Sequence, residues 1–415
     1  SYYAMLTILT LKMLLMIVYL AHWDWILTQS RKDIVSNIND SKFMAICPIE
    51  DRKEELNSIY QSTKNWKLKR DRIFDLKGIL NLRKILEELT RDDIVHVFTL
   101  KSGLLLCFAN IFKKRKKTKN ILTITGLGYL FSENSIAKIL KFILSFFIDK
   151  LINKNFNELI FQNLNDQKLF LEYSNFKNRN TIIPTSGINT EDYLVKPKKD
   201  YEDKKLKVIM ATRLLEDKGV LKYVELAKIT SQPDIEFYLA GDIDEGNPNS
   251  LSQNQLQRIK DLEYINFLGQ INIKRKLKDF DVNIVMSEYE GSSRILLEAV
   301  YVGLICISNN IPGTSTLDVG YPHRTNILIE NNDVDRFKKE LLKIFNSHNE
   351  YLNSTEKFGW DSQKIFKRDQ ARNDRIVIKN KFTSVKVAEK YNKIYKGYQR
   401  SGIGKKWKDS SDVGE

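Results

Sequence analysis

The sequence predicts an α/β protein built from two parallel sheets, and two observations carry this prediction. Short, continuous apolar runs alternate with stretches whose apolar residues recur every three or four positions, as in buried parallel strands joined by helices. This alternation stops at a polar, lysine-rich stretch, residues 196–205, and then starts again. A chain of 415 residues is long enough for two such domains. We therefore expect two Rossmann-like domains that face one another.

The first domain is expected over residues 13–195. An amphipathic helix is expected at residues 76–90, and strands are expected at residues 13–21, 42–49, 93–100, 120–128 and 158–163. The apolar dozen residues before the first strand are interpreted as an extension of the chain, because Lys12 interrupts the run and no basic segment precedes it. A peripheral membrane anchor is the alternative interpretation of this stretch.

The second domain is expected over residues 205–380, followed by a C-terminal helix over residues 381–400. Its strands are expected at residues 206–214, 235–241, 265–269, 282–287 and 304–309, and its helices at residues 219–229, 273–280 and 294–303. Apolar residues recur at helical spacing in residues 384–398, which also carry a basic face.

Composition limits the kinds of site that the chain can hold. Cys47, Cys107 and Cys306 lie far apart in the sequence, which argues against a disulfide framework or zinc site and fits a reducing compartment. The net charge of +15 peaks in the run KKRKKTK, residues 113–119. A solvated loop explains such a run, and so does an anionic membrane surface or a phosphorylated ligand. Nucleic acid ranks last because no RNA-binding aromatic motif or zinc finger accompanies the charge.

Two expected loops at strand ends carry the residue types that bind a charged ligand. Arg213 ends the first strand of the second domain, and Lys218 precedes the following helix. Two cations beside a helix N-terminus suit a diphosphate. The alternative interpretation is that these two cations only form surface ion pairs with Glu216 or Asp217.

The second loop follows the expected strand at residues 282–287. Its Gly-Ser-Ser turn, residues 291–293, is expected to cap a helix and to present backbone N–H groups that suit a phosphate. Glu290 precedes that helix and Glu298 lies within it, and sugar hydroxyls are natural hydrogen-bond donors to such carboxylates. An ion pair between Glu298 and Arg294, four residues earlier, is the alternative.

Residues 288–313, EYEGSSRILLEAVYVGLICISNNIPG, resemble the E-x7-E signature of the retaining glycosyltransferases of family four, which have the GT-B fold. The usual proline of that signature is absent at Leu304-Ile305. Residues 211–220, ATRLLEDKGV, are similar to the R-x4-K-G phosphate motif of the same family. The signature positions that match are Glu290, Gly291, Glu298, Ala299, Gly303 and Gly313.

The resemblance implies a role for each matching residue. Arg213 and Lys218 would hold the diphosphate of the donor and stabilise it as the leaving group. Glu298 would bind the ribose of the nucleotide, and Glu290 the hydroxyls of the donor sugar. Further donor-binding residues would be Gly291, Ser292, Ser293, Arg294, Leu297 and Gly187.

Other stretches resemble a subgroup that adds N-acetylhexosamine or hexose units to polyprenyl-diphosphate-linked sugars. Gly126 and Gly128 would let the backbone approach the donor or acceptor. His96 ends a strand where related enzymes carry an active-site histidine, with Thr99 or Lys101 as other occupants of that position. A structural histidine is the alternative for His96. The similar stretches are TITGLGYLF, FQNLNDQKLF, SGIN and GDIDEGNP, which begin at residues 123, 161, 186 and 241.

The resemblance also implies the reaction and its partners. A hexose or N-acetylhexosamine would move with retention from a nucleotide diphosphate, UDP in particular, to a lipid-diphosphate-linked or other polysaccharide-precursor acceptor. The C-terminal helix would pack back on the first domain. No metal or cofactor is expected, although residues 242–244 and 333–335 have the D-x-D form, because Arg213 and Lys218 supply the positive charge.

The same resemblance suggests where the chain works. The basic run would attach the protein to the inner, cytoplasmic face of the cell membrane, in a pathway such as O-antigen or capsule synthesis. Two alternatives remain open at this point. One is a UDP-sugar 2-epimerase of the same fold, and the other is a non-catalytic basic protein that binds membrane or nucleic acid.

Overall fold

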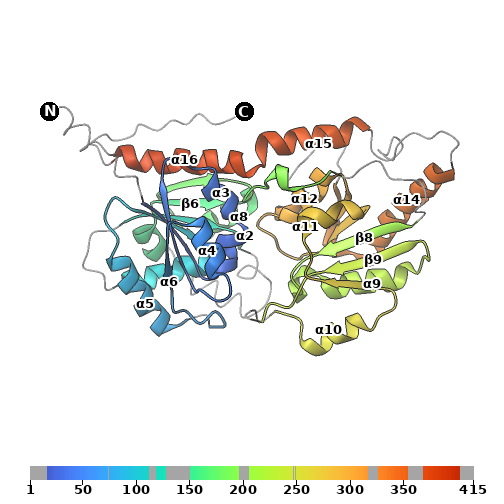
Figure 1. Cartoon of the computed structure of the whole chain (residues 1–415), viewed down its shortest axis with the longest axis horizontal. Coiled ribbons are helices and arrows are strands. Elements are labelled where there is room, and N and C mark those ends of the chain that lie inside the picture. Colours follow the sequence, from blue (N-terminus) through green and yellow to red (C-terminus); the bar gives the residue numbers. More distant parts are fainter. Residues whose placement is uncertain are drawn as a thin grey trace.

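The computed structural model has two α/β halves, each built around a parallel sheet (Figure 1). It describes residues 16–72, 74–111, 118–127, 150–195, 205–245, 247, 249–315, 326–353 and 368–401. Several expected features lie outside these residues. They are the start of the first strand at residues 13–15, most of the basic run at residues 113–117, Gly128, and most of the lysine-rich stretch at residues 196–204.

The first half is a seven-stranded sheet in the order β3-β2-β1-β4-β5-β6-β7, in which every pair of neighbours is parallel. Its strands are β1 (Met16–Ala21), β2 (Lys42–Cys47), β3 (Ser62–Asn65), β4 (Ile94–Phe98), β5 (Lys119–Ile124), β6 (Glu158–Phe161) and β7 (Arg179–Ile182). Its helices are α2 (Asp24–Gln29), α3 (Lys32–Ser36), α4 (Lys53–Ile59), α5 (Leu76–Glu87), α6 (Leu100–Asn110) and α8 (Leu164–Tyr173).

The second half is a six-stranded parallel sheet in the order β10-β9-β8-β11-β12-β13. Its strands are β8 (Leu206–Ala211), β9 (Ile235–Ala240), β10 (Asn266–Gly269), β11 (Val282–Val285), β12 (Ile305–Asn309) and β13 (Asn326–Ile329). The helical elements are η3 (Glu216–Lys218), α9 (Val220–Thr230), α10 (Gln253–Lys260), α11 (Ile273–Lys276), η4 (Leu277–Asp279), α12 (Arg294–Val302), α13 (Pro312–Ser315), η5 (Glu330–Asn332) and α14 (Val334–Asn353).

The strands of the second sheet follow the same order as the first six strands of the first sheet, so the fold repeats itself along the chain and the expectation of two Rossmann-like halves is confirmed. In each sheet the order reverses beside the first strand, between β1 and β4 and again between β8 and β11. Ligands bind at such reversal points, next to the carboxyl ends of the strands. Apolar clusters cover both faces of each sheet, as continuous apolar strands require.

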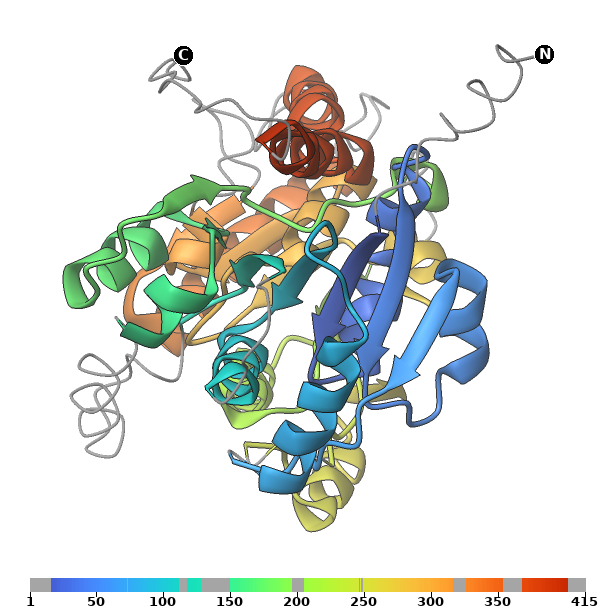
Figure 2. The same ribbon diagram turned by 90° about the vertical axis from the view of Figure 1, so that its left-hand side faces the viewer.

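Two C-terminal helices connect the halves. α15 (Arg368–Lys381) lies over the second half and α16 (Ser384–Ser401) over the first, and both run along one side of the molecule (Figures 1 and 2). The inner face of α16 packs into the core of the first half through Val387, Ala388, Tyr391, Ile394 and Tyr395. The C-terminal helix therefore packs back on the first half, as expected. Within the described ranges, none of the helices combines the length and the apolar character that crossing a bilayer requires.

Candidate active site

A cleft of about 1370 Å³ lies between the two halves. Residues at or just beyond the ends of β1, β4, β5 and β6 line it on one side, and residues that follow β8, β9, β10 and β11 line it on the other. The carboxyl ends of both sheets thus border one cavity, which is where doubly wound sheets bind their ligands.

Lys218 and Glu290 meet in this cleft. The Nζ atom of Lys218 lies 2.8 Å from Oε1 of Glu290 and 3.2 Å from the carbonyl oxygen of Tyr289. The hydroxyl of Ser287 donates to the same Oε1 at 2.9 Å. Lys218 is only 9% exposed, so a buried cation is held at the cleft by a carboxylate of the neighbouring loop. Its partner is therefore Glu290, and no described contact pairs it with Glu216 or Asp217.

Arg213 belongs to a charge network that spans the two halves. Its NH1 atom lies 2.9 Å from Oδ2 of Asp244, and Oδ1 of Asp244 lies 2.7 Å from NH2 of Arg70 in the first half. The guanidinium of Arg70 stacks on the ring of Trp23, 4.2 Å from its centroid. Asp244 is a residue of the first D-x-D triplet, and here it joins two arginines across the cleft.

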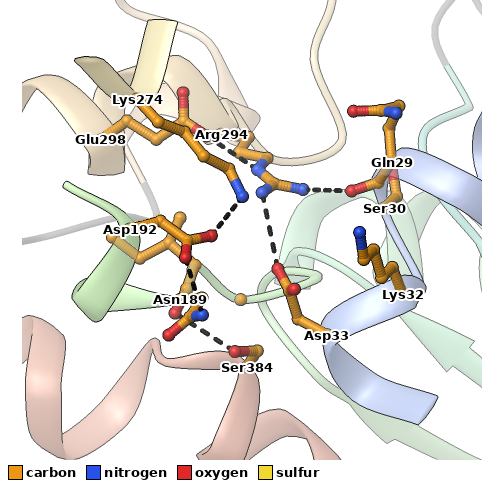
Figure 3. Close-up of polar contacts among 12 residues, drawn as sticks. Gln29, Ser30, Lys32, Asp33, Asn189, Asp192, Lys274, Arg294, Glu298 and Ser384 are labelled. Carbon is orange, nitrogen blue, oxygen red and sulfur yellow. Dashed lines mark hydrogen bonds and ion pairs between the residues drawn. The ribbon is translucent and has the colours of Figure 1, made fainter. Parts of the chain in front are cut away.

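Glu298 is held by donors from two elements. The hydroxyl of Tyr193 donates to its Oε1 at 2.6 Å, and Nε of Arg294 donates to the same oxygen at 2.8 Å. Arg294 also reaches the first half, where its NH1 donates to the carbonyl oxygen of Gln29 at 2.8 Å (Figure 3). The ion pair between Glu298 and Arg294 is present, and both side chains also line the cleft.

The Gly-Ser-Ser turn makes contact with the first half as well as with α12. A Cβ atom at Gly291 would lie 1.8 Å from the carbonyl oxygen of Thr125, and one at Gly126 would lie 3.2 Å from the Gly291 nitrogen. The two glycines therefore let the loops of the two halves touch. The N–H group of Ser293, which was expected to face a ligand, donates instead to the carbonyl oxygen of Gly313 at 2.9 Å.

The serine hydroxyls of this turn, unlike the N–H group of Ser293, have no hydrogen-bond partner among the described residues. Ser293 is the N-cap residue of α12, yet its side chain makes no capping hydrogen bond. Both Ser292 and Ser293 line the cleft, and among the described residues their buried hydroxyl oxygens have no hydrogen-bond partner. Buried polar atoms of this kind require a partner, which at a cleft can come from a ligand.

His96 does not reach the cleft, which contradicts the catalytic role expected for it. The ring is fully buried, with Nδ1 2.6 Å from the hydroxyl of Tyr395 and Nε2 2.7 Å from that of Thr123. Burial, together with the charge of Arg31, holds the pKa of His96 well below its ordinary value. The structural alternative is correct, because His96 ties α16 to the sheet of the first half.

Among the described residues, His22 is the histidine that lines the cleft, and the sequence did not single it out. It follows β1, and the parallel pairing of Ala21 with Phe98 brings it beside Thr99. Its Nδ1 lies 2.9 Å from the hydroxyl of Thr99 and 3.0 Å from that of Ser102. Burial and the cations of Lys101, Arg70 and Arg213 lower its pKa to about 3, so the ring is neutral near pH 7. Its place immediately after the first strand was the available signal.

Five other predicted site residues lie outside the cleft lining. They are Gly126 and Gly291, whose loops meet between the halves, and Gly187, Leu297 and Lys101. A Cβ atom at Gly187, which has a φ of +77°, would lie 2.6 Å from the backbone of Ser384, so this glycine lets α16 start close to the chain. Leu297 is fully buried in the apolar cluster beneath α12. The amino group of Lys101 donates to the carbonyl oxygen of Arg70 at 2.6 Å. These residues therefore do not line the cleft, and their donor- or acceptor-binding roles stay predictions, whereas Thr99 does line the cleft.

An aromatic and acidic surface on the first half was also missed. Trp23 and Trp25 stack with their ring centroids 5.2 Å apart, and both line the cleft together with Glu50, Asp51 and further residues of α2. These residues come from separate loops, so no contiguous motif marks them. For metal binding, the described part of the chain holds no cluster of three or more His, Cys, Asp or Glu side chains.

Comparison with known protein families gives the same division of the chain. Residues 16–163 match the family described as Glycosyl transferase 4-like, and residues 194–359 match Glycosyl transferases group 1. A relative from Escherichia coli, UDP-Gal:alpha-D-GlcNAc-diphosphoundecaprenol alpha-1,3-galactosyltransferase, is 26% identical over 339 residues, which cover 78% of this chain and 80% of the relative.

Solved structures share the architecture at low sequence identity. Sucrose-phosphate synthase from Thermosynechococcus elongatus superposes with a TM-score of 0.70 at 13% identity, covering 93% of this chain and all of that chain (100%). Anabaena Alr3699/HepE in complex with UDP and glucose gives a TM-score of 0.66 at 15% identity, covering 92% and 100%. The chain is a glycosyltransferase of the GT-B fold, with a Glycosyl transferase 4-like first half and a group 1 second half.

Proposed function

We propose that the chain transfers a hexose or N-acetylhexosamine, with retention, from a UDP-sugar to a sugar linked to a lipid diphosphate. One observation carries this proposal: Lys218, Arg213, Glu290 and Glu298 line one cleft at the carboxyl ends of the second sheet. Two cations suit a diphosphate, and two carboxylates suit the hydroxyls of the ribose and of the sugar. The solved complexes of Anabaena Alr3699/HepE with UDP and UDP-glucose support the choice of donor.

The charges of the site suit the replacement of a carboxylate by a diphosphate at Lys218 and at Arg213. Lys218 is paired with Glu290 and Arg213 with Asp244, so each cation already holds an oxygen anion at hydrogen-bond distance. A diphosphate that enters the cleft would take up these same donors. Glu290 would then be released toward the sugar hydroxyls, and the unpartnered hydroxyls of Ser292 and Ser293 would gain an acceptor.

In the proposed reaction the bond between the anomeric carbon and the β-phosphate oxygen breaks, and the acceptor hydroxyl oxygen bonds to that carbon on the same face. The acceptor proton passes to the departing diphosphate. Lys218 and Arg213 stabilise the negative charge that grows on the leaving group. Glu290, which hydrogen-bonds sugar hydroxyls in this scheme, acts as a holding residue and not as the nucleophile.

We further propose that the reaction needs no metal ion. Asp244 is shared by two arginines, and the two cations beside the expected diphosphate do the work that a divalent ion would do. Transfer should therefore continue in the presence of EDTA. Activity that EDTA abolishes and manganese restores would contradict this part of the proposal.

The acceptor is proposed to bind on the first half. Trp23 and Trp25 offer stacked aromatic rings at the cleft, and Glu50 and Asp51 offer acceptors for sugar hydroxyls. The name of the E. coli relative describes a diphosphoundecaprenol-linked sugar as its acceptor, which supports a lipid-linked acceptor here. Replacing Trp25 by leucine should raise the KM for such an acceptor and leave acceptor-free hydrolysis of the donor unchanged.

We propose peripheral attachment to the cytoplasmic face of the cell membrane through the first half. Leu76 and Leu80 share one face of α5 and are exposed, as is Phe74 before the helix, and the exposed Lys77 and Lys84 lie on the same helix. The double variant Leu76→Ser/Leu80→Ser should float less with anionic vesicles and should keep its activity on a water-soluble acceptor. Equal flotation of variant and wild type would contradict this face, and salt-insensitive flotation would contradict the electrostatic part.

The proposed function is tested by incubating the protein with a panel of nucleotide sugars and a short-chain prenyl-diphosphate sugar. Product mass identifies the sugar transferred, and the coupling constant of the new anomeric proton reports the configuration. We expect one added hexose or N-acetylhexosamine with the donor configuration retained. A modified or hydrolysed UDP-sugar that forms at the same rate without acceptor would favour the epimerase alternative instead.

A further inference from the structure

The crossing segment, residues 189–193, belongs to neither sheet yet borders the nucleotide side of the cleft. It contains η2 (Thr190–Asp192) followed by Tyr193. Asp192 accepts a hydrogen bond from Asn189 at 3.1 Å and forms an ion pair with Lys274 of α11 (Figure 3). These contacts attach the crossing segment to the second half, beside α12.

Glu298 uses only one of its carboxylate oxygens for contacts within the described structure. Tyr193 and Arg294 both donate to Oε1, at 2.6 Å and 2.8 Å. No described residue donates to Oε2, and Glu298 lines the cleft. A carboxylate held in this way presents one saturated oxygen to the protein and one available oxygen to a ligand.

An arginine beside a carboxylate often occupies both oxygens through two parallel hydrogen bonds. Arg294 does not, because its NH1 donates to the carbonyl oxygen of Gln29 and its NH2 lies 4.0 Å from Oδ2 of Asp33 (Figure 3). The first half therefore holds one side of the guanidinium, and Tyr193 holds Oε1. Without the hydroxyl of Tyr193, the carboxylate could turn and offer both oxygens to Arg294.

Tyr193 and Arg294 both keep their protons near neutral pH. Burial and the charge of Glu298 raise the pKa of Tyr193, so its hydroxyl keeps its proton and remains a donor. Burial disfavours the charged form of Arg294, but Glu298 and Tyr193 outweigh it and raise the pKa of the guanidinium. The direction of both hydrogen bonds to Oε1 is therefore constant.

We propose that Tyr193 is a positioning residue that keeps Oε2 of Glu298 directed at the ribose hydroxyls, and that it thereby sets a preference for ribonucleoside diphosphates over deoxy analogues. This inference rests on the proposed function, in which Glu298 binds the ribose. It adds a residue from the crossing segment to a site that is otherwise built from α12 and from loops at strand ends.

The test compares dissociation constants for UDP and for 2′,3′-dideoxyuridine diphosphate, measured by calorimetry. The wild type should bind UDP about 100-fold more tightly, since the analogue leaves Oε2 of Glu298 without its hydroxyl donors. Tyr193→Phe should reduce this ratio about tenfold by weakening UDP alone. Tyr301→Phe is the matched control, because Tyr301 is also buried and its ring centroid lies 6.3 Å from that of Tyr193. It should leave the ratio unchanged.

A second experiment, in a chain that carries Glu298→Gln, separates a positioning role of Tyr193 from a purely structural one. In a Glu298→Gln chain the ratio should already be small, and adding Tyr193→Phe should reduce it no further. If Tyr193→Phe keeps the wild-type ratio, or weakens both nucleotides equally, Tyr193 is not a positioning residue and the inference fails. If the wild type itself binds both nucleotides equally, the proposed contact between Glu298 and ribose fails instead, so the two failures are distinguishable.

Discussion

The two halves of the chain share one strand order but build their sides of the cleft in different ways. In the second half, the site comes from short contiguous stretches, with Arg213 near Lys218 and Glu290 near Glu298. In the first half, His22, Arg70 and Thr99 come from separate loops. A site encoded in short stretches can be read as a motif, whereas a dispersed site becomes visible only when the strands are paired.

The halves also differ in how their charges are compensated. Lys218 and Glu290 are both from the second half and neutralise one another locally. Arg70 of the first half is paired mainly across the cleft, with Asp244 of the second. The pair of Lys218 and Glu290 therefore depends on the second half alone, whereas the pairing of Arg70 depends on the arrangement of both halves. This contrast predicts that substitutions in the second half change donor binding and turnover, and that substitutions in the first half change stability.

The largest effect is expected for Lys218→Met, which removes a cation from the proposed leaving-group site. The transfer rate should fall about 10²- to 10³-fold, as when one preorganised electrostatic donor is lost. Lys222→Met is the matched control, because Lys222 lies four residues later and pairs with Glu288 at 3.7 Å on the surface. Steady-state kinetics of both variants test this prediction. An equal loss of transfer rate in both would contradict a specific role for the lysine in the cleft.

Glu290→Gln should have the next largest effect. Turnover should fall about 10- to 100-fold, because a hydrogen bond to a charged group is replaced by one to a neutral amide. The KM for the donor should change less than turnover, in contrast to Glu298→Ala, which should mainly weaken donor affinity. Glu288→Gln removes the exposed carboxylate two residues earlier and serves as the control. Unchanged kinetics in both Glu290→Gln and Glu298→Ala would refute the donor site.

On the first half, His22 should make stability depend on pH. Folding lowers its pKa from 6.5 to about 3, so below pH 6.5 the unfolded chain binds a proton that the folded chain does not. The contribution of His22 to the free energy of unfolding is therefore complete above pH 6.5. It falls by about 2 kcal/mol when the pH is lowered to 5. Thermal melting at pH 7 and pH 5 should show a larger drop for the wild type than for His22→Asn. Equal drops would mean that His22 titrates normally.

The smallest effect on the donor site is expected for Tyr395→Phe, away from the cleft. Its hydroxyl lies 2.6 Å from Nδ1 of His96 and 3.0 Å from the hydroxyl of Tyr19, so its loss should destabilise the first half by about 1 kcal/mol for each bond lost. UDP affinity should stay the same, because the second half does not use this contact. A changed affinity for UDP would show that α16 acts on the donor site.

Much of the fold follows from the sequence because apolar periodicity reports burial directly. The strands that escaped notice are β3, β7 and β13, at sheet edges. β3 and β7 consist largely of polar residues, as in Ser62–Asn65 and Arg179–Ile182, and lack the apolar run of a central strand. Edge strands have one unpaired side and bury less surface, so their composition carries less of a signal.

The candidate site was predictable only where its contacts are local. The i,i+4 pair of Arg294 and Glu298 follows from helical spacing. The hydroxyl of Tyr193, which reaches Glu298 from 105 positions away, does not. The same limit explains the two histidines. His96 lies in the middle of β4, where α16 covers it, whereas His22 follows the end of β1 and faces the cleft.

The most direct test of the account is a calorimetric titration with UDP of the wild type, Lys218→Met and Lys222→Met, with EDTA present throughout. The account predicts one binding site in the wild type, the same affinity in Lys222→Met and at least tenfold weaker binding in Lys218→Met. Absence of UDP binding to the wild type, or equal affinity in all three proteins, would contradict the claim that this cleft is a nucleotide-sugar site.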